Sequence, residues 1–516
     1  MYCGDETGSF IGEIGSHTSR FGYGGEDNPK LVVPSFTITE ERNTSNSSGD
    51  NKKRRMWTSS LQSPSQTREE RMESILRMAS SSNENESDTV EWSKIFPQTN
   101  PDAFLRQGDS VENWDSLQTA WETSMVTLRA TDTQKHTVGG NPYIPKGTST
   151  TKSSSTVKST PLEGKCIHPL LAITPGITHF EGVGKDYMAA YKRQQYAQYT
   201  EIFMEALDAT SMFLAPAPML ASFSLGRQTA LIVDVGAGGC RATPIVDGLV
   251  LQQSQRRNGR GGDWLGNITW KALLNEYDVA PTPRYLLRNA TVNQKESNKV
   301  QSLWYRQSMN DLMYEVRTQP FVTVQSNDSP KIRVPFLKTK HASSPSPPGS
   351  PDSVTRSGAS YELPDGTSVD LTSSFGRDLQ QLPELLFSDT LPFAESKDVQ
   401  SMPSTFSTSP LHQLVKESLL AVGDVDARKE LTGSICLVGA SSLFPNLDTR
   451  LSQELSNLLP SFVKPKVVAS RISVERSCAA WIGGSILTSL GSFQQLWLSR
   501  TEYEEYGTGM AIQRFP

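Results

Sequence analysis

Runs of apolar residues along the chain predict short strands joined by glycine-rich turns. The clearest run is Thr229–Val235, which is β-branched and apolar apart from one acid, Asp234. It has the length and composition of a buried strand rather than of a helix. Glycines then force a tight turn, because they adopt turn conformations at little cost. The turn and the two strands expected after it are Gly236–Gly239, Thr243–Val246 and Leu249–Leu251.

A second hairpin of the same kind lies near the start of the chain, within Phe10–Gly25. A short strand carries Glu13, the turn Gly15-Ser16-His17-Thr18 follows, and the next strand carries Arg20. Such a turn presents backbone N–H groups to a phosphate, while the acid faces a metal-bound water. One glycine hairpin is most often only a turn. Two of them in one chain predict a two-lobed fold that clamps a nucleotide's phosphates.

Longer segments with helical periodicity separate these strands. The tyrosine stripe that includes Tyr196 and Tyr199 is expected in the core. The Gly483-Gly484 pair indicates close helix packing rather than ligand contact. Helices are expected within Gly108–Ala130, Asp186–Leu207, Asn446–Leu459 and Ala479–Leu490, and a short one within Arg68–Ala79.

Composition narrows the class of protein. The 516 residues carry 50 basic and 55 acidic side chains, a balance that argues against coating nucleic acid by bulk charge. A hydrophobic content of 36% predicts that part of the chain stays unfolded. Five cysteines without CxxC spacing indicate reduced thiols and no zinc site. No apolar run reaches 18 residues and no signal peptide is recognisable, so a soluble intracellular protein is expected.

Several segments resemble actin, in actin's order along the chain. The resemblance implies an α/β fold with two lobes, the ATPase fold shared by actin, hexokinase and the Hsp70-type chaperones, interrupted by long low-complexity insertions. Within this superfamily the start Tyr2–Glu6 and the hairpin Leu249–Gln253 are most similar to the actin-related protein 4 subfamily. The segments similar to actin are Glu13–Pro34, His168–Leu171, Glu362–Gly366 and Trp481–Tyr503. Trp264–Leu274 resembles the start of actin's large-lobe helix, so a helix is expected there.

The resemblance also predicts how the lobes divide the chain, as one actin-like fold over 1–516. The small lobe is expected from 1–35, 101–130, 167–227 (with the hinge) and 478–516, and the large lobe from 228–329 and 361–477. Insertions are expected at 36–100, in place of actin's second subdomain, at 131–166, and at 330–360, which is rich in Ser and Pro.

By the same resemblance, ATP with Mg²⁺ held through the nucleotide is the implied cofactor. The nucleotide-binding positions would be Glu13, Gly15, Ser16, His17, Arg20, Asp234, Gly236, Gly238, Gly261, Gly439 and Ala440. Several residues depart from actin, however. Glu13 replaces an aspartate, His17 a glycine and Arg20 a lysine. The glutamine and histidine near the attacking water are Ala217 and Arg241, the second acid is Ala237, and an adenine-side lysine is Ser477.

Water attack on a phosphoanhydride needs an oriented nucleophile and a metal-neutralised leaving group. Both supports are missing, so we expect no catalytic residues and little or no ATP hydrolysis. Two readings stay open for the cleft. It binds nucleotide statically, or it is empty or closed by side chains and the glycines serve turn geometry alone.

The subfamily resemblance implies a non-catalytic structural subunit of a nuclear chromatin-remodelling or histone acetyltransferase complex, acting in transcription regulation and DNA repair. The implied partners are monomeric nuclear actin, a helix of the remodelling ATPase or acetyltransferase scaffold, and histones or the nucleosome indirectly. The basic run Lys52, Lys53, Arg54 and Arg55 is a nuclear import candidate. Its alternative is a solvated charge cluster.

Three further readings stay open. One is a cytoplasmic actin-related protein of a motor-adaptor or filament-nucleating complex, and another is an ATP-hydrolysing member of the superfamily. The third concerns a cluster of arginines just before the predicted large-lobe helix, which would touch phosphate or nucleic acid, or only solvent. These arginines are Arg256, Arg257 and Arg260.

Overall fold

A computed structural model describes most of the segments in which strands and helices were expected. The described residues are 8–41, 89–94, 111, 113–138, 168–176, 185–277, 281–282, 302–324, 334–336, 360–390, 409–461 and 463–516. The import candidate Lys52–Arg55, the short helix proposed for Arg68–Ala79 and the Ser/Pro-rich centre of 330–360 lie outside them.

The first sheet has six strands in the order β16-β7-β6-β1-β2-β3. Strands β1, β6 and β7 run parallel, whereas β2, β3 and β16 add antiparallel edges. The β1–β2 pairing places the predicted hairpin at one end of this sheet. The strands are β1 (Phe10–Ile14), β2 (Thr18–Tyr23), β3 (Leu31–Pro34), β6 (Leu170–Thr174), β7 (Ser211–Pro216) and β16 (Leu498–Ser499).

Aromatic side chains form the core of this small lobe. Trp121 is fully buried and its ring contacts Phe10, Phe21 and Phe203. Tyr196 is 4% exposed and belongs to the same core, as the periodicity predicted. The helices around the sheet are α2 (Trp114–Val138), α3 (Lys185–Glu201, continued by a π-helical turn at Ile202–Ala206), α14 (Ala479–Ser489), α15 (Arg500–Tyr506) and α16 (Gly509–Arg514).

The second sheet has the order β10-β9-β8-β14-β15, with β11 paired to β9. The antiparallel β8–β9 pair forms the second predicted hairpin, and β14 runs parallel to β8 and to β15. The strands are β8 (Ala230–Val235), β9 (Cys240–Val246), β10 (Leu249–Val250), β11 (Arg256–Asn258), β14 (Ile435–Val438) and β15 (Val467–Ala469).

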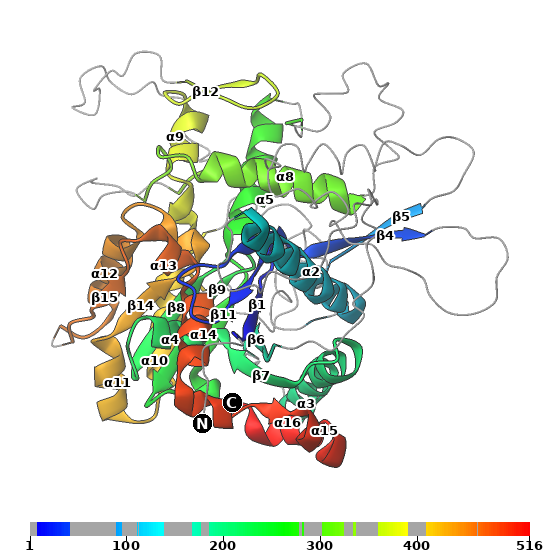
Figure 1. Cartoon of the computed structure of the whole chain (residues 1–516). Coiled ribbons are helices and arrows are strands. Elements are labelled where there is room, and N and C mark those ends of the chain that lie inside the picture. The colour runs from blue at the N-terminus through cyan, green and yellow to red at the C-terminus, as the bar shows by residue number, and fades with distance from the viewer. Residues whose placement is uncertain are drawn as a thin grey trace, which may run out of the picture.

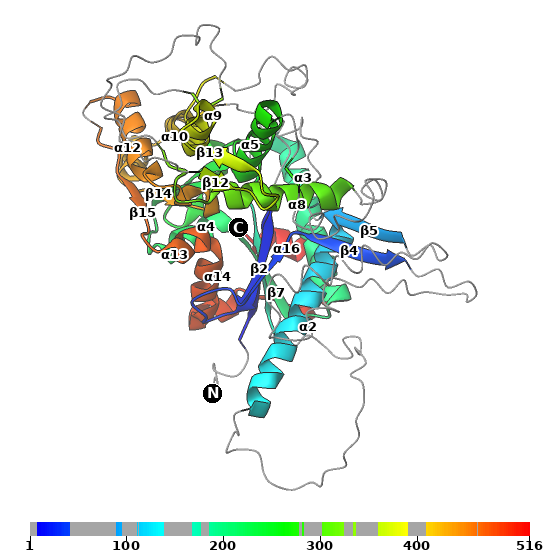
Figure 2. The ribbon, with the colours of Figure 1, turned by 90° about the horizontal axis from the view of Figure 1, so that it is seen from above.

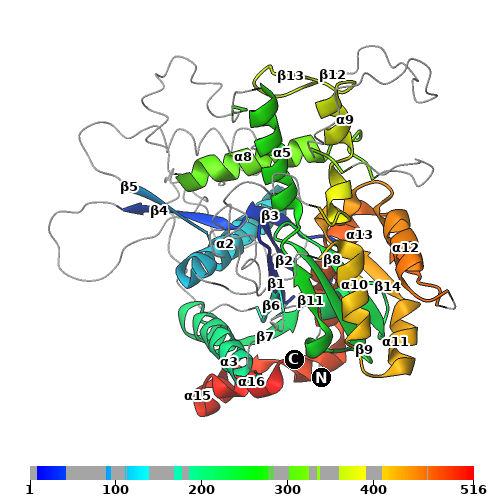
Figure 3. The same ribbon diagram turned by 180° about the vertical axis from the view of Figure 1, so that it is seen from behind.

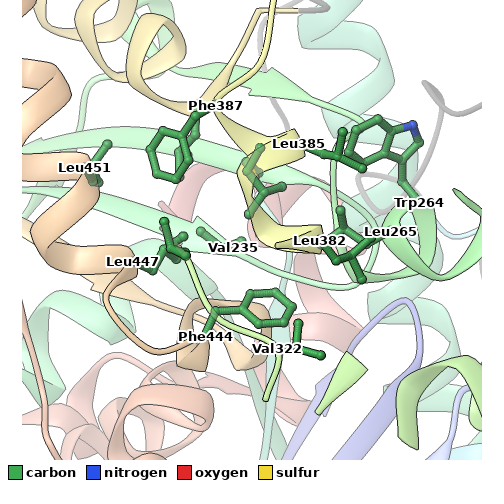
Figure 4. Close-up of a cluster of buried hydrophobic side chains, with 14 of the residues drawn as sticks. Val235, Trp264, Leu265, Val322, Leu382, Leu385, Phe387, Phe444, Leu447 and Leu451 are labelled. Carbon is green, nitrogen blue, oxygen red and sulfur yellow. The ribbon is translucent and has the colours of Figure 1, made fainter. Parts of the chain in front are cut away.

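A separate hydrophobic core fills this large lobe (Figure 4). It joins the sheet residue Val235 to Leu265 on α5 and Leu447 on α12. The two lobes appear together in Figure 1, with α5 and α8 above the small-lobe hairpin. The helices are α5 (Gly262–Tyr277), α8 (Ser302–Arg317), α9 (Ser374–Gln380), α10 (Leu411–Leu420), α11 (Val425–Thr432), α12 (Leu447–Leu458) and α13 (Ser473–Ser477).

Helix α4 (Ala217–Ser224) connects the sheets and packs closely against α14. Gly483 of α14 makes this contact, because a Cβ there would lie 1.8 Å from the Leu220 carbonyl oxygen. The predicted role in close helix packing is therefore confirmed for Gly483, whereas Gly484 packs on side chains of the sheet. Among the helices of the described chain, none is long and apolar enough to cross a membrane.

The structure adds two features that the sequence analysis did not predict. Residues in the 36–100 insertion form an antiparallel pair, β4 (Phe36–Glu41) with β5 (Thr89–Lys94), which projects from the body in Figure 3. Helix α2 continues to Val138, beyond the expected end at residue 130. A two-stranded pair, β12 (Ser360–Glu362) with β13 (Ser368–Asp370), turns at Glu362–Gly366, a segment of this chain that resembles actin.

Candidate functional site: the cleft between two glycine hairpins

The first hairpin places an acid and a base directly opposite each other. Glu13 on β1 pairs in register with Arg20 on β2, and their side chains form an ion pair of 2.8 Å. Both side chains are mostly buried. The turn between them begins at Gly15, where a Cβ would lie 2.6 Å from the Thr18 carbonyl oxygen. The cation that the resemblance assigned to phosphate is thus bonded to the acid that replaces actin's aspartate.

The second hairpin repeats the arrangement with Asp234 on β8 opposite Arg241 on β9. Burial raises the pKa of the Asp234 carboxyl to about 6, although Arg241 opposes this shift. Glu13 raises this pKa as well and Arg20 lowers it, so the charges of both hairpins act on the same carboxyl. The structure therefore brings together the two hairpins that the sequence predicted to face each other.

Gly439, at the end of β14, packs directly onto Asp234. Its φ is +94°, a value that side-chain-bearing residues rarely adopt, and a Cβ there would lie 2.3 Å from Asp234 Oδ1. Its N–H donates to the Arg476 carbonyl oxygen at 2.9 Å. Ala440 begins the 3₁₀ turn that follows, Ala440–Leu443. Turn geometry and close approach to Asp234 are sufficient reasons for this glycine.

The second turn is fixed to the start of α5. The N–H of Gly262 donates to the Gly236 carbonyl oxygen, and that of Asp263 to the Ala237 carbonyl oxygen, both at 3.0 Å. A Cβ on Gly261 would lie 2.2 Å from the backbone nitrogen of Gly239. Gly261 therefore allows the turn and the start of the helix to touch.

His17 reaches from the small-lobe turn into the large lobe. Its Nδ1 lies 3.5 Å from Asp263 Oδ1 on α5, and its Nε2 lies 3.3 Å from Asp311 Oδ1 on α8. The ring stacks on Tyr314 with 5.8 Å between centroids. Burial alone would lower the pKa of His17, but Asp263 and Asp311 outweigh it and raise that pKa to about 9. The imidazole is therefore a cation at neutral pH.

Arg317, at the end of α8, occupies the large-lobe side of the same region. It is 4% exposed, donates to the Gly262 carbonyl oxygen, and lies over the Tyr314 ring at 5.1 Å. A Cβ on Gly262 would meet Arg317 Nη2 at 2.8 Å and Ser441 Oγ at 2.6 Å. Burial lowers the pKa of Arg317. A protein side chain thus fills space between α5, α8 and the 3₁₀ turn after β14.

The positions expected to support hydrolysis carry groups that cannot orient water as actin's do. Ala217 is the first residue of α4, and Ala237 lies in the second turn, where only its backbone is polar. Arg241 is 8% exposed, and its Nη1 lies 3.9 Å from the Cβ position of Gly176 at the end of β6. The guanidinium therefore extends toward the small lobe where actin places a histidine.

Bound Mg-ATP would need backbone donors for its phosphates and acidic side chains for the water shell of its metal. The N–H groups of Ser16, Ala237 and Gly238 donate to no other backbone group that the structure describes, so the turns fit a phosphate. The side chains do not fit hydrolysis of a metal-bound triphosphate. Ala237 offers no acid for the water shell of the metal, and the His17 cation is paired with acids of the opposite lobe. Among the described residues, no cluster of His, Cys, Asp or Glu could hold a metal by itself.

The arginine cluster before α5 is part of the fold. Arg260 is 5% exposed and donates to the carbonyl oxygens of Leu385 and Ser388. Arg257 lies on β11 in register with Arg241, and its charge lowers the pKa of Asp234. The expectation that these arginines are solvated is wrong for Arg260, because its guanidinium closes a turn of the large lobe.

Sequence reasoning missed the residues that meet His17. Asp311, Tyr314 and Arg317 recur every three positions on α8, so they share one helix face. Met309, Leu312 and Met313 lie on the buried side. This polar stripe was a detectable signal, but nothing in the sequence indicated that it faces a turn almost 300 positions earlier.

Comparison with known proteins agrees with this architecture. The family model described as Actin matches residues 4–156 and 186–516. Three similar proteins are each named Actin-related protein 4. The one from Oryza sativa subsp. indica is 28% identical and the one from Arabidopsis thaliana 29%, each alignment covering 100% of both chains. The Neurospora crassa protein is 27% identical over 100% of this chain and 96% of its own. The chain therefore belongs to the actin family.

Proposed function

We propose that this protein is a non-catalytic structural subunit of a nuclear chromatin-remodelling or histone acetyltransferase complex. The observation that carries the proposal is a pair of facts about one chain. It is similar over its whole length to proteins named Actin-related protein 4, and the hydrolysis positions of its cleft hold Ala217, Ala237 and Arg241. The chain keeps the actin fold but lacks the side chains that support ATP hydrolysis in actin. This combination is expected of a subunit whose role is to bind other proteins.

The C-terminal segment supports a partner that docks as a helix. Phe493 and Trp497 are buried in the small-lobe core and fix the segment after α14. Leu490 and Leu496 flank them and are 49% and 50% exposed, and Ile486 on α14 is 43% exposed. Apolar side chains held on a rigid support suit a helix-in-groove partner. We propose that this partner is a helix of the remodelling ATPase or acetyltransferase scaffold, on which monomeric nuclear actin lies alongside this chain.

The test is affinity purification of the tagged full-length chain from nuclear and cytoplasmic extracts, with mass-spectrometric identification of the proteins recovered. We expect monomeric actin and subunits of a remodelling ATPase or acetyltransferase complex, from the nuclear extract. Histones should be recovered through the complex and be lost when it is dissociated by salt. A double variant, Leu490→Asp and Leu496→Asp, tests the docking surface. It keeps the buried Phe493 and Trp497, and it should no longer recover the scaffold subunit that the wild-type chain recovers.

Two results would contradict the proposal. Recovery of motor-adaptor or filament-nucleating subunits from cytoplasm would assign the chain to the cytoplasmic alternative. Recovery of no partner from either extract would remove the evidence for a structural subunit. Replacing Lys52–Arg55 by alanines tests the import candidate separately, because the variant should accumulate in cytoplasm while still binding actin in a lysate.

A further inference from the structure

The His17 side chain connects the two lobes directly, beside the turns of the two hairpins. It leaves the β1–β2 turn of the small lobe and lies between α5 and α8 of the large lobe, 3.5 Å from Asp263 and 3.3 Å from Asp311. Strand β2 and helix α8 meet near the centre of Figure 2. The His17 side chain is 12% exposed, so solvent screens these ion pairs weakly.

Among the described residues, the polar and charged groups that lie near the ring come from α5, α8 and the histidine's own hairpin. Helix α5 contributes Asp263, and helix α8 contributes Asp311, Tyr314 and, one turn further, Arg317. On the histidine's own hairpin, the Glu13 and Arg20 charges are paired with each other. The imidazolium of the small lobe therefore lies between two carboxylates of the large lobe.

Loss of the ring's proton would remove the positive charge that the small lobe places beside Asp263 and Asp311. The neutral ring would lose its electrostatic attraction to these two carboxylates, although its stacking on Tyr314 would remain. Protonation of His17 and contact between the lobes are thus thermodynamically linked, so that each favours the other.

We propose that the His17 imidazolium is a clasp that holds the two lobes closed without nucleotide, and that the clasp opens when the ring is deprotonated. The carboxylates Asp263 and Asp311 of the large lobe are its other half. The ion pairs of His17 would then hold the two lobes together, as a triphosphate bound between two phosphate hairpins would. The inference goes beyond the proposed function and does not rest on it.

The pH range follows from the direction of the shift. The pKa of His17 is about 9 in the folded chain, above the 6.5 of an unperturbed histidine. Stability from the clasp is therefore complete below about pH 6.5. It falls as the pH rises and is lost above about pH 9.

The test uses the full chain, stripped of nucleotide by EDTA and apyrase, between pH 6.5 and 9.5. Small-angle scattering reports the radius of gyration, and NMR of ¹³C-labelled histidine reports the ring, assigned by the signal missing in His17→Gln. We expect a midpoint near pH 9, with a rise in the radius of gyration at the same pH. Asp311→Asn should move the midpoint down by more than one pH unit, a tenfold change in proton affinity.

Matched variants separate the clasp from a general effect of alkaline pH. His17→Gln should be open at every pH in the range, and the radius of gyration of the wild type should approach that of the variant toward pH 9.5. Glu276→Gln removes a charge from an exposed position on α5 and should behave as the wild type. A His17 midpoint near 6.5, or a radius of gyration that falls only when Mg-ATP is added, would overturn the proposal. So would His17→Gln with a wild-type radius of gyration at pH 6.5.

Discussion

At the scale of single residues, Gly439 shows how closely the backbone approaches the carboxyl group of Asp234. Its positive φ and its contact with Asp234 are independent constraints, and each excludes a side chain. Gly226 also has a positive φ, of +63°, but no atom lies within 4 Å of its Cβ position. Gly439 therefore has two constraints, since its ψ of 152° places it in a region that essentially only glycine adopts and its Cβ position is occupied. Gly226 has only the constraint of a positive φ.

This difference gives a prediction for stability. Gly439→Ala combines backbone strain with overpacking and should lower the free energy of unfolding by about 3 kcal/mol. Gly226→Ala carries the strain alone and should cost about 1 kcal/mol. Urea unfolding followed by circular dichroism measures both. Equal losses would show that the contact with Asp234 relaxes without cost.

Some residues of the cleft could be predicted and others could not. Asp234 and Glu13 were recognisable because each ends a strand before a glycine turn, a local pattern. Asp263 and Asp311 were not, because their relation to His17 exists only after three distant segments have folded together. The sequence showed that His17 replaces a glycine of actin, and the structure shows where the ring goes.

At the scale of elements, the contact between α4 and α14 joins the connection between the sheets to the C-terminal part of the chain. A Cβ on Gly483 would collide with the backbone of α4, whereas Gly484 only meets side chains of the sheet at 3.0 Å or more. Backbone cannot move aside as a flexible side chain can. The helices approach each other at the distance that Gly483 permits.

We therefore expect Gly483→Ala to force the two helices apart and to destabilise the small lobe by about 3 kcal/mol or more, since overpacking a close contact is costly. Differential scanning calorimetry on the full chain measures the effect. Gly491→Ala is the control, because its Cβ position meets nothing within 4 Å and its φ is not positive. A Gly483→Ala variant as stable as this control would contradict the packing argument.

The elements themselves were largely predictable, since their apolar spacing is strong. The exceptions have physical reasons. Strands β4 and β5 are short alternations around Ile38 and Trp92, separated by a long polar stretch, and only their pairing defines them. Helix α2 passes through Thr131, Asp132 and Thr133, which have low helix propensity, so the sequence alone suggested an earlier end.

At the scale of the whole molecule, a two-lobed ATPase fold without water-orienting groups should not turn over. With 1 mM Mg-ATP, we expect phosphate release no faster than in buffer, measured by a colorimetric phosphate assay with conventional actin as the positive control. The reason is that Ala217 and Ala237 supply no polar side chain to the reaction. Magnesium-dependent release that disappears in Asp234→Asn would show that the cleft is an active ATPase.

The order of strands in the small lobe has a consequence for how the chain is made. Strand β16 at residues 498–499 pairs with β7, and α14 covers the sheet formed by β1 and β6. During synthesis the ribosome releases the whole large-lobe core, which ends near Leu455, before these pieces. The first strands to be translated therefore wait, with apolar surface exposed, for the last forty residues. Nascent chains of this protein should depend on protection from aggregation until translation is nearly finished.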